Sequence, residues 1–154
     1  MHIGNGVTEI GKQAFTACKA MVEVHISEGV TEIGNYAFRD CKSLLTMRIP
    51  NSVTTLGYQV FCDCSALKEL HLPDNITRIP SYLCDRCESL EEIHIPDGVT
   101  DIHQNAFRDC KALTTINIPD GITLIRGDVF YGCVALDEAT RAAIRRVSPG
   151  GLFG

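Results

Sequence analysis

The sequence predicts a solenoid in which six coils of 23 residues stack on one another, with a parallel sheet on one face and a helix at the C-terminal end. Six of the eight cysteines recur every 23 residues, at Cys18, Cys41, Cys64, Cys87, Cys110 and Cys133. Columns of Phe, Leu, Thr and Pro keep the same period, with no insertion, from Ile3 to Leu136. A unit this short cannot bury its own apolar residues, so the units must bury each other by stacking.

The composition of the 154-residue chain is that of one ordinary globular domain. Hydrophobic residues make up 45% and charged residues 21%, which excludes a disordered chain. The net charge of −5 argues against nucleic-acid binding, which needs clustered Lys and Arg to neutralise phosphates. No apolar run approaches the roughly 20 residues that span a bilayer. The first residues also lack the basic and apolar segments of a signal peptide.

Each coil is expected to contain a strand of the type seen in residues 44–49, LLTMRI. Because successive strand side chains point to opposite faces, Met47 and Ile49 should point inward. Thr46 and Arg48 should then point outward and form part of the surface. This alternation predicts one buried and one exposed column of side chains along the sheet.

A turn and a second extended piece should follow each strand. Pro50 ends its strand because it has no N–H to donate to a ladder. In the Pro-Asp-Gly tetrad that begins at Pro96, proline presets φ and Gly98 tolerates a positive φ. Residues 99–102 form the second extended piece, and the Ala-Phe-x-x-Cys stretch then closes the coil in a loop or short helical turn. One invariant column of the second piece is expected to face inward, with its hydroxyls bonded to the backbone: Thr8, Thr31, Thr54, Thr77, Thr100 and Thr123.

The two ends of the array differ. Ile3 is already in register with the repeat, so we expect no cap on the first coil. An uncapped coil predicts either that the chain is a piece of a longer array or that this end pairs with another molecule. At the other end, Asp137 is expected to cap an amphipathic helix. The chain therefore divides into a solenoid over residues 1–136, a capping helix over 137–147 and a flexible tail over 148–154. The helix face expected to pack on the last coil consists of Leu136, Ala139, Ala143, Ile144 and Val147.

The repeat resembles that of the BspA-like leucine-rich repeat family over about residues 3–136. The family unit reads roughly I-P-x-x-V-T-x-I-G-x-x-A-F-x-x-C-x-x-L-x-x-I-x, and residues 95–113, IPDGVTDIHQNAFRDCKAL, match it nearly position by position. The resemblance implies a right-handed leucine-rich-repeat solenoid without a family-wide active site, in a bacterial surface or secreted adhesion protein. The missing signal segment and free thiols instead favour the cytoplasm or a trimmed fragment, so the compartment stays open.

The cysteines form a ladder with two additions. The ladder is expected to consist of buried free thiols, because cysteine is small and apolar enough for a tight column. A disulfide within the ladder is not excluded by the coil spacing of about 4.8 Å. Cys62 and Cys84 lie near Cys64 and Cys87, and Cys62 alone occupies a column expected to be exposed. A zinc site of these four thiolates and a disulfide that includes Cys62 are the alternatives to plain packing.

A polar stripe is expected on the outward face of the sheet. Four of the five histidines share one column, interrupted by Arg48, and Glu or Thr occupies the column two residues earlier. Rigid solenoids commonly bind partners through such faces. The alternatives are a solvated face with local Glu–His pairs, and a divalent metal site or pH switch. The predicted partner-binding residues are Glu23, His25, Thr46, Arg48, Glu69, His71, Glu92, His94, Thr115 and Asn117.

Motifs of enzymes are missing from the sequence: there is no G-x-S-x-G, P-loop, H-E-x-x-H or G-x-G-x-x-G. An open sheet face also has no deep pocket to exclude water. The sequence therefore predicts a non-catalytic interaction or adhesion module that binds a protein or glycan, with no cofactor, metal or nucleic acid. The alternative is a structural segment that stacks or self-associates through its first coil. A metal- or redox-responsive module is the third interpretation.

Overall fold

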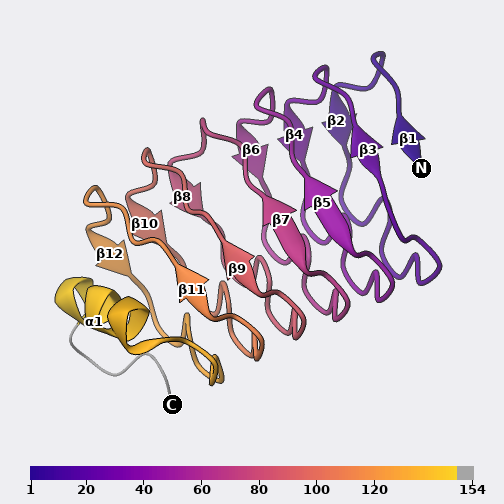
Figure 1. Ribbon diagram of the computed structural model, residues 1–154. Helices are drawn as coiled ribbons and strands as arrows, with labels where there is room; N and C mark the ends of the chain where they lie inside the picture. Colours follow the sequence, from indigo (N-terminus) through magenta and orange to yellow (C-terminus); the bar gives the residue numbers. More distant parts are fainter. Residues whose placement is uncertain (149–154) are drawn as a thin grey trace.

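The computed structural model describes residues 1–148 and shows a solenoid with strands along two faces and a helix at the C-terminal end (Figure 1). Every strand pairing is parallel and joins residues 23 positions apart, as between Arg48 and His71. The first face carries β1 (His2–Ile3), β3 (His25–Ile26), β5 (Thr46–Arg48), β7 (Glu69–His71), β9 (Glu92–Ile93) and β11 (Thr115–Ile116). The second face carries β2 (Glu9–Ile10), β4 (Glu32–Ile33), β6 (Thr55–Leu56), β8 (Arg78–Ile79), β10 (Asp101–Ile102) and β12 (Leu124–Ile125).

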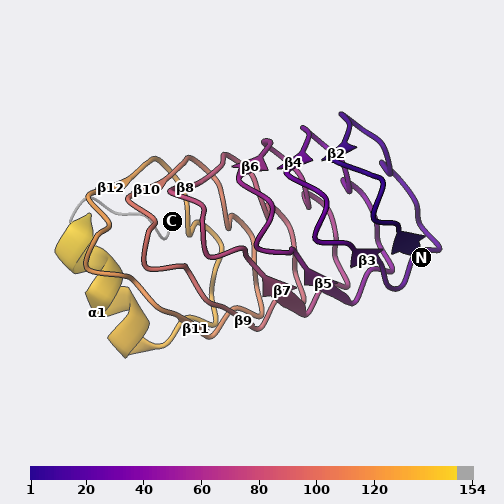
Figure 2. The ribbon, with the colours of Figure 1, turned by 90° about the horizontal axis from the view of Figure 1, so that it is seen from above.

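The two faces run along opposite edges of the stack when it is seen from above (Figure 2). The first face is a four-stranded sheet, β11-β9-β7-β5, beside the pair β1-β3. A single bridge between Glu23 and Thr46 connects these two sheets. The second face consists of two three-stranded sheets, β2-β4-β6 and β8-β10-β12. The second extended piece of each coil is therefore a strand, and the sequence-based expectation of a sheet on one face was incomplete.

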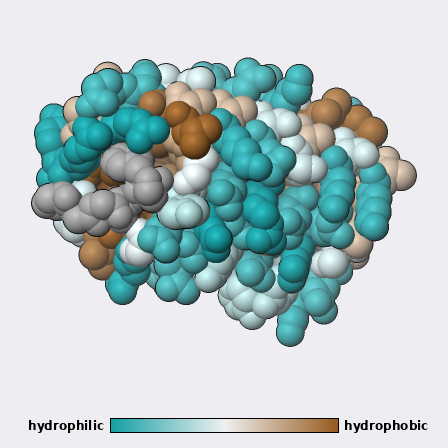
Figure 3. All heavy atoms as spheres, turned by 90° about the horizontal axis from the view of Figure 1, so that it is seen from below, coloured by the Kyte–Doolittle hydropathy of each residue, from teal (hydrophilic) through white to brown (hydrophobic). Residues whose placement is uncertain are grey.

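The core lies between the two faces and consists of side-chain columns that run along the solenoid. Met47 and Ile49 are buried and Thr46 and Arg48 exposed, as strand alternation predicts. The outer surface seen from below is mostly hydrophilic, with small apolar patches (Figure 3). Aromatic rings of successive coils stack in the core with centroids 5.2–5.8 Å apart, in the pairs Phe15–Phe38, Phe38–Phe61 and Phe107–Phe130.

The Ala-Phe-x-x-Cys stretch forms a non-helical corner that has its own hydrogen-bond ladder. The N–H of Tyr36 donates to the carbonyl of Tyr58 at 3.0 Å, and the N–H of Asp40 to that of Cys62 at 2.8 Å. Both donors adopt a positive φ of 61°. Gly132, at the position equivalent to Asp40, has a φ of 75°. The chain therefore turns through left-handed residues at the corner, where Asp, Asn and Gly are tolerated best.

The predicted Pro-Asp-Gly turns form, but they do not use the special freedom of glycine. The N–H of Val99 donates to the carbonyl of Pro96 at 3.0 Å and closes the turn. Gly98 is not among the residues with a positive φ. Its turn is thus one that most residues can adopt, and the left-handed positions lie in the corner instead.

The threonine column is exposed, so the prediction that it faces inward is wrong. The expected bonds to the backbone are nevertheless present at three positions. The hydroxyls of Thr31, Thr100 and Thr123 donate to the threonine carbonyl of the preceding coil at 3.2–3.3 Å. Carbonyls of stacked coils point along the solenoid axis, so a side chain on the outside can reach them. A hydroxyl among the apolar core columns would instead need a buried partner.

The cysteine ladder is buried except for Cys18, which is half-buried, and all eight cysteines are free thiols. Each of the five inner ladder thiols donates to a backbone carbonyl that lies 26 residues earlier, at 3.0–3.2 Å. Cysteine therefore fills a small apolar space and also supplies the donor for a carbonyl of the preceding coil. The ladder thiols that meet this description are Cys41, Cys64, Cys87, Cys110 and Cys133.

Cys62 is only 1% exposed, so the prediction of an exposed column is wrong at this position. Its Sγ lies 3.4 Å from Asp63 Oδ2 and 3.6 Å from Asp85 Oδ2. Burial and the charge of Asp63 raise the pKa of the Cys62 thiol well above its usual range. Burial likewise raises the pKa of Asp85, which is 3% exposed. Two hydrogen bonds from Arg86, at 2.6 and 2.8 Å, lower the pKa of Asp63.

Three of the four thiols of the proposed zinc site have separate hydrogen-bond partners. Cys64 and Cys87 donate to the backbone carbonyls of Phe38 and Phe61, whereas Cys62 faces carboxylates. Within residues 1–148, no three His, Cys, Asp or Glu side chains are grouped so that they could hold a metal ion. The zinc interpretation is therefore wrong for the described residues, and Cys62 is not in a disulfide.

Helix α1 (Glu138–Val147) covers the last coil. The Asp137 side chain accepts the N–H of Thr140 at 2.7 Å, so the predicted N-cap is confirmed. Ile144 and Thr140 are buried on the coil, whereas Ala139 is exposed, contrary to the predicted packing face. Of the tail predicted for 148–154, all but Ser148 falls outside the described residues. In the described part of the chain, α1 included, no helix is long and apolar enough to span a membrane.

We expect Phe107→Ala to lower the free energy of unfolding by about 3–5 kcal/mol, because it removes a fully buried ring and leaves a cavity. Urea denaturation followed by circular dichroism measures this change. The control Val134→Ala, at a side chain that is 74% exposed, should stay within about 0.5 kcal/mol of the wild type. A similar loss in both variants would contradict the assignment of the core.

Ellman's reagent should titrate one thiol rapidly in the folded protein, because only Cys18 is partly accessible. The remaining thiols should react only as the protein unfolds. In guanidinium chloride all eight should react without a reductant. A smaller total would reveal a disulfide and would contradict the free ladder.

The Asp63–Arg86 pair should make stability depend on pH. Because the folded-state pKa of Asp63 lies below its ordinary value, the pair stabilises the fold above that value and loses its effect as the pH falls through the lowered pKa. Asp63→Asn should therefore destabilise the protein near pH 7, and the difference from the wild type should shrink towards about pH 3. Urea denaturation at both pH values measures the difference. A constant difference would contradict the pairing.

Candidate functional site

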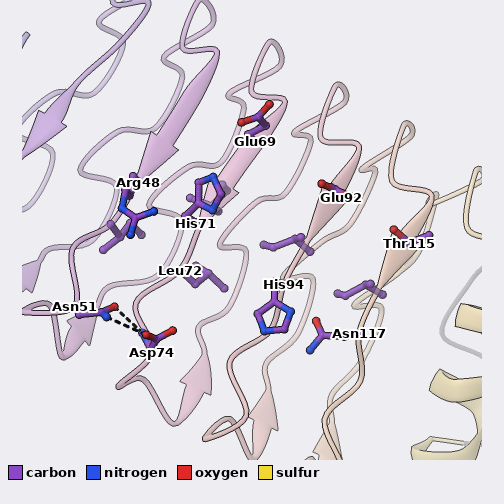
Figure 4. A pocket seen from close by; sticks show the side chains of 14 residues that line it. Arg48, Asn51, Glu69, His71, Leu72, Asp74, Glu92, His94, Thr115 and Asn117 are labelled. Carbon is purple, nitrogen blue, oxygen red and sulfur yellow. Dashed lines mark hydrogen bonds between the residues drawn. The ribbon is translucent and has the colours of Figure 1, made fainter.

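A hollow of about 460 Å³ lies on the first face, over β5, β7, β9 and β11 (Figure 4). The outward side chains of the strands form its walls, and partly covered Leu and Ile side chains form its floor. Seven of the ten residues predicted for partner binding line this hollow: Arg48, Glu69, His71, Glu92, His94, Thr115 and Asn117.

The parallel register determines which polar groups stand side by side. Glu69 and His71 point outward from β7 because they are two residues apart. Across the strands, Arg48 is opposite His71, and Glu69 is opposite Glu92. Like charges that face each other on adjacent strands lower the stability of a sheet. The Glu69–Glu92 pairing is therefore a feature that packing alone does not favour.

Five charged or titratable side chains on the strands of the hollow have no partners among residues 1–148. Arg48, Glu69, His71, Glu92 and His94 make no side-chain hydrogen bond or ion pair with any described residue. The expected local Glu–His pairs are thus not formed, and the metal-site alternative fails because no suitable group of ligands is present in residues 1–148. What remains is a row of unpaired donors and acceptors on a rigid sheet.

Asn117 has a structural role at the end of the row. Its Oδ1 accepts the N–H of Ile95 at 2.6 Å, and its Nδ2 donates to the carbonyl of Ile95 at 2.8 Å. The amide thus takes up both backbone groups of Ile95 and has little capacity left for a ligand. Although the sequence placed Asn117 in the binding column, the structure makes it a support for the segment that follows β9.

Two lining residues were missed by the sequence analysis. Asn51 Nδ2 donates to Asp74 Oδ2 at 2.9 Å, and the N–H of Asp74 donates to Asn51 Oδ1 at 3.0 Å (Figure 4). They lie 23 residues apart, in the turn column directly after Pro50 and Pro73. Their shared position in the repeat was the signal that could have linked them to each other. Turn residues do not follow the inward–outward alternation of a strand, however, so the sequence did not place them beside the first face.

Three predicted residues lie outside the hollow. Glu23, His25 and Thr46 belong to the N-terminal part of the first face and do not line it. The ring of His25 stacks on that of His2, with centroids 4.9 Å apart and planes 8° apart. The predicted stripe is therefore divided into a histidine pair near the N-terminus and the hollow over β5 to β11.

Comparisons with known proteins agree with this architecture. Residues 1–112 and 77–142 match the model of the BspA type leucine-rich repeat region, in six copies. No curated protein matches the chain by sequence.

Three solved bacterial structures share the fold. A leucine-rich repeat protein from Bacteroides ovatus has a TM-score of 0.79 at 22% identity, over 88% of this chain and 47% of that one. The leucine-rich repeat protein of T. pallidum has a TM-score of 0.74 at 22% identity, over 96% and 80%. A leucine-rich cell surface protein from Faecalibacterium prausnitzii has a TM-score of 0.75 at 27% identity, over 98% and 51%.

This chain spans about half the length of the B. ovatus and F. prausnitzii proteins. The family model, in contrast, accounts for nearly all of the described residues. With its 23-residue period and its two faces of short parallel strands, the chain belongs to the BspA-type leucine-rich repeat family.

Proposed function

We propose that the protein is a non-catalytic interaction or adhesion module that binds a protein or glycan through the hollow of the first face. One observation carries this proposal: Arg48, Glu69, His71, Glu92 and His94 are held side by side without partners among the described residues. A bound partner would supply the missing counter-charges and hydrogen bonds. Strand-face residues on a rigid solenoid lose little freedom on binding, which favours affinity.

The pairing of Glu69 with Glu92 supports a role in binding rather than in stability. Two carboxylates on adjacent parallel strands repel one another, and no cation of the described residues bridges them. A partner that places a positive group between them would relieve this repulsion. The unpaired Arg48 at the other side of the hollow offers the opposite charge, so the surface favours a partner with groups of both signs.

The relatives add support for a surface role. The F. prausnitzii protein is described as a cell surface protein, and it aligns with nearly all of this chain. We extend that role to this protein as part of the proposal. A catalytic role is not favoured, because no two titratable groups of the hollow lie within hydrogen-bonding distance of each other.

A structural segment that stacks through the first coil is the second candidate function. The end of the solenoid at β1 and β2 has a shallow hollow of about 320 Å³ lined mainly by apolar residues. Met1 and Val7 there are 53% and 36% exposed. A further coil or a second molecule placed against this end would cover them and pair the two edge strands.

Alanine substitution of Arg48, His71 and His94 together should weaken partner binding by at least about tenfold, because it removes three unpaired polar groups of the hollow. Biolayer interferometry against extracellular matrix proteins and mucin glycans measures the change. The matched control replaces Lys19, Lys42 and Arg146, which are exposed elsewhere. An equal loss of partner binding in both triple variants would contradict the proposal, because it would mean that binding depends on the overall charge and not on the hollow.

A sedimentation experiment tests the second candidate function. If the first coil stacks on another molecule, the wild type should associate as its concentration rises, and Val7→Asp should abolish the association. The triple variant of the first face should then associate normally. Unchanged binding by the triple variant, together with loss of association in Val7→Asp, would replace the first proposal with the second.

A further inference from the structure

The ladder of the second face is interrupted between β6 and β8. In the other coils, the threonine N–H donates to the threonine carbonyl of the preceding coil: Thr31 to Thr8, Thr54 to Thr31, Thr100 to Thr77 and Thr123 to Thr100, at 2.8–3.0 Å. Thr77 makes no such bond to Thr54. The sheet therefore ends at Leu56 and begins again at Arg78.

Pro80 accounts for one of the hydrogen bonds missing at this interruption. Residues at the same position in other coils donate their N–H to the isoleucine carbonyl of the preceding coil, as Gly57 does to Ile33 at 2.8 Å and His103 to Ile79 at 3.0 Å. Proline has no N–H, so the Leu56 carbonyl receives no backbone hydrogen bond from residues 1–148. The break therefore leaves one carbonyl of the second-face ladder without a backbone donor among the described residues.

A hollow of about 520 Å³ lies at this break. Gly34 and Gly57 form part of its floor. A Cβ on Gly57 would lie 2.4 Å from the nitrogen of Asn35, so a side chain cannot occupy this position without moving the neighbouring coil. The missing side chains at Gly34 and Gly57 thus let the backbones of adjacent coils approach closely beside the hollow. The volume of the hollow suits a small ligand.

Tyr58 provides an aromatic wall for the hollow. Its side chain is 41% exposed. The ring of Tyr36 packs edge-on against it, with centroids 4.9 Å apart and planes at 75°, and Asn35 Oδ1 accepts its backbone N–H at 3.0 Å. These contacts hold the ring in place, so its free surface is prearranged for packing against a ligand.

Much of the polar lining consists of side chains that have no hydrogen-bond partner in the described part of the chain. The side chains of Glu32, Thr55, Arg78 and Ser81 make no hydrogen bond with any described residue. Burial, followed by the charges of Arg126 and Arg78, lowers the pKa of His103. Its ring is therefore neutral at pH 7 and offers both a donor and an acceptor.

We propose that this hollow on the second face is a saccharide-binding site. Sugar hydroxyls both donate and accept, which matches a lining of carboxylate, guanidinium, hydroxyl and backbone carbonyl groups. The apolar C–H face of a sugar ring packs on an aromatic ring, and Tyr58 supplies one. The hollow of the first face has no Tyr, Phe or Trp in its lining, so the two surfaces differ in chemistry. This proposal does not depend on binding by the first face.

The test is an NMR titration of the full chain with three neutral oligosaccharides: chitotetraose, cellotetraose and mannotetraose at millimolar concentration. We expect at least one of them to shift the ring signals of Tyr58. Tyr58→Ala should weaken that binding by about tenfold or more, and Tyr58→Phe should retain it because the ring remains. Tyr131→Ala is the matched control, since Tyr131 is 44% exposed and lies outside the hollow.

Pro80→Ala supplies a second test that changes only one lining side chain, that of Pro80 itself. The new N–H can donate to the Leu56 carbonyl and continue the ladder, so saccharide binding should fall while the unfolding temperature stays the same or rises. If none of the three oligosaccharides shifts the Tyr58 signals, the proposal is overturned. It is also overturned if Tyr131→Ala weakens binding as much as Tyr58→Ala does. The triple variant of the first face should bind saccharide normally, which separates the two proposals.

Discussion

The rest of the structure depends on the strict 23-residue register of backbone hydrogen bonds between coils. Neighbouring coils bond along the first face, at the corner and, except between β6 and β8, along the second face. A buried backbone group without a partner costs free energy, so all three ladders must stay aligned at once. An insertion in one coil would displace them together. The stack can therefore vary its outward side chains widely, but it cannot vary the length of its repeat.

The corner shows how a small repeat satisfies this requirement. Two residues of most coils, such as Tyr36 and Asp40, adopt a positive φ and turn the chain within a few residues. The ladder thiols then donate to the carbonyls of the preceding coil, which lie beneath this corner. These five cysteines thus take part in the hydrogen bonding of the backbone. Cys62 faces Asp63 and Asp85 instead, and its raised pKa keeps the thiol protonated and therefore a poor nucleophile.

The two faces obtain their free polar groups in different ways. On the first face, strand alternation places Glu and His columns outward, and the register sets like groups beside one another. On the second face, Pro80 removes one donor and interrupts the ladder, which leaves a backbone acceptor beside Tyr58. Both surfaces rest on the same rigid core, so a change in one need not disturb the other. A short solenoid of this kind can carry two chemically distinct surfaces.

The sequence alone determined the period, the strands with Met47 and Ile49 inward, and the helix capped by Asp137. These features follow from local rules, because alternation, turn chemistry and capping act over a few residues. Only the tertiary structure decided that the threonine column faces outward, that Cys62 is buried and that Glu69 and His71 remain unpaired. The reason is physical: the direction of a corner side chain depends on left-handed backbone positions and on which carbonyls the next coil presents. The backbone conformation of the corner and the carbonyls of the next coil do not follow from the alternation of side chains within one coil.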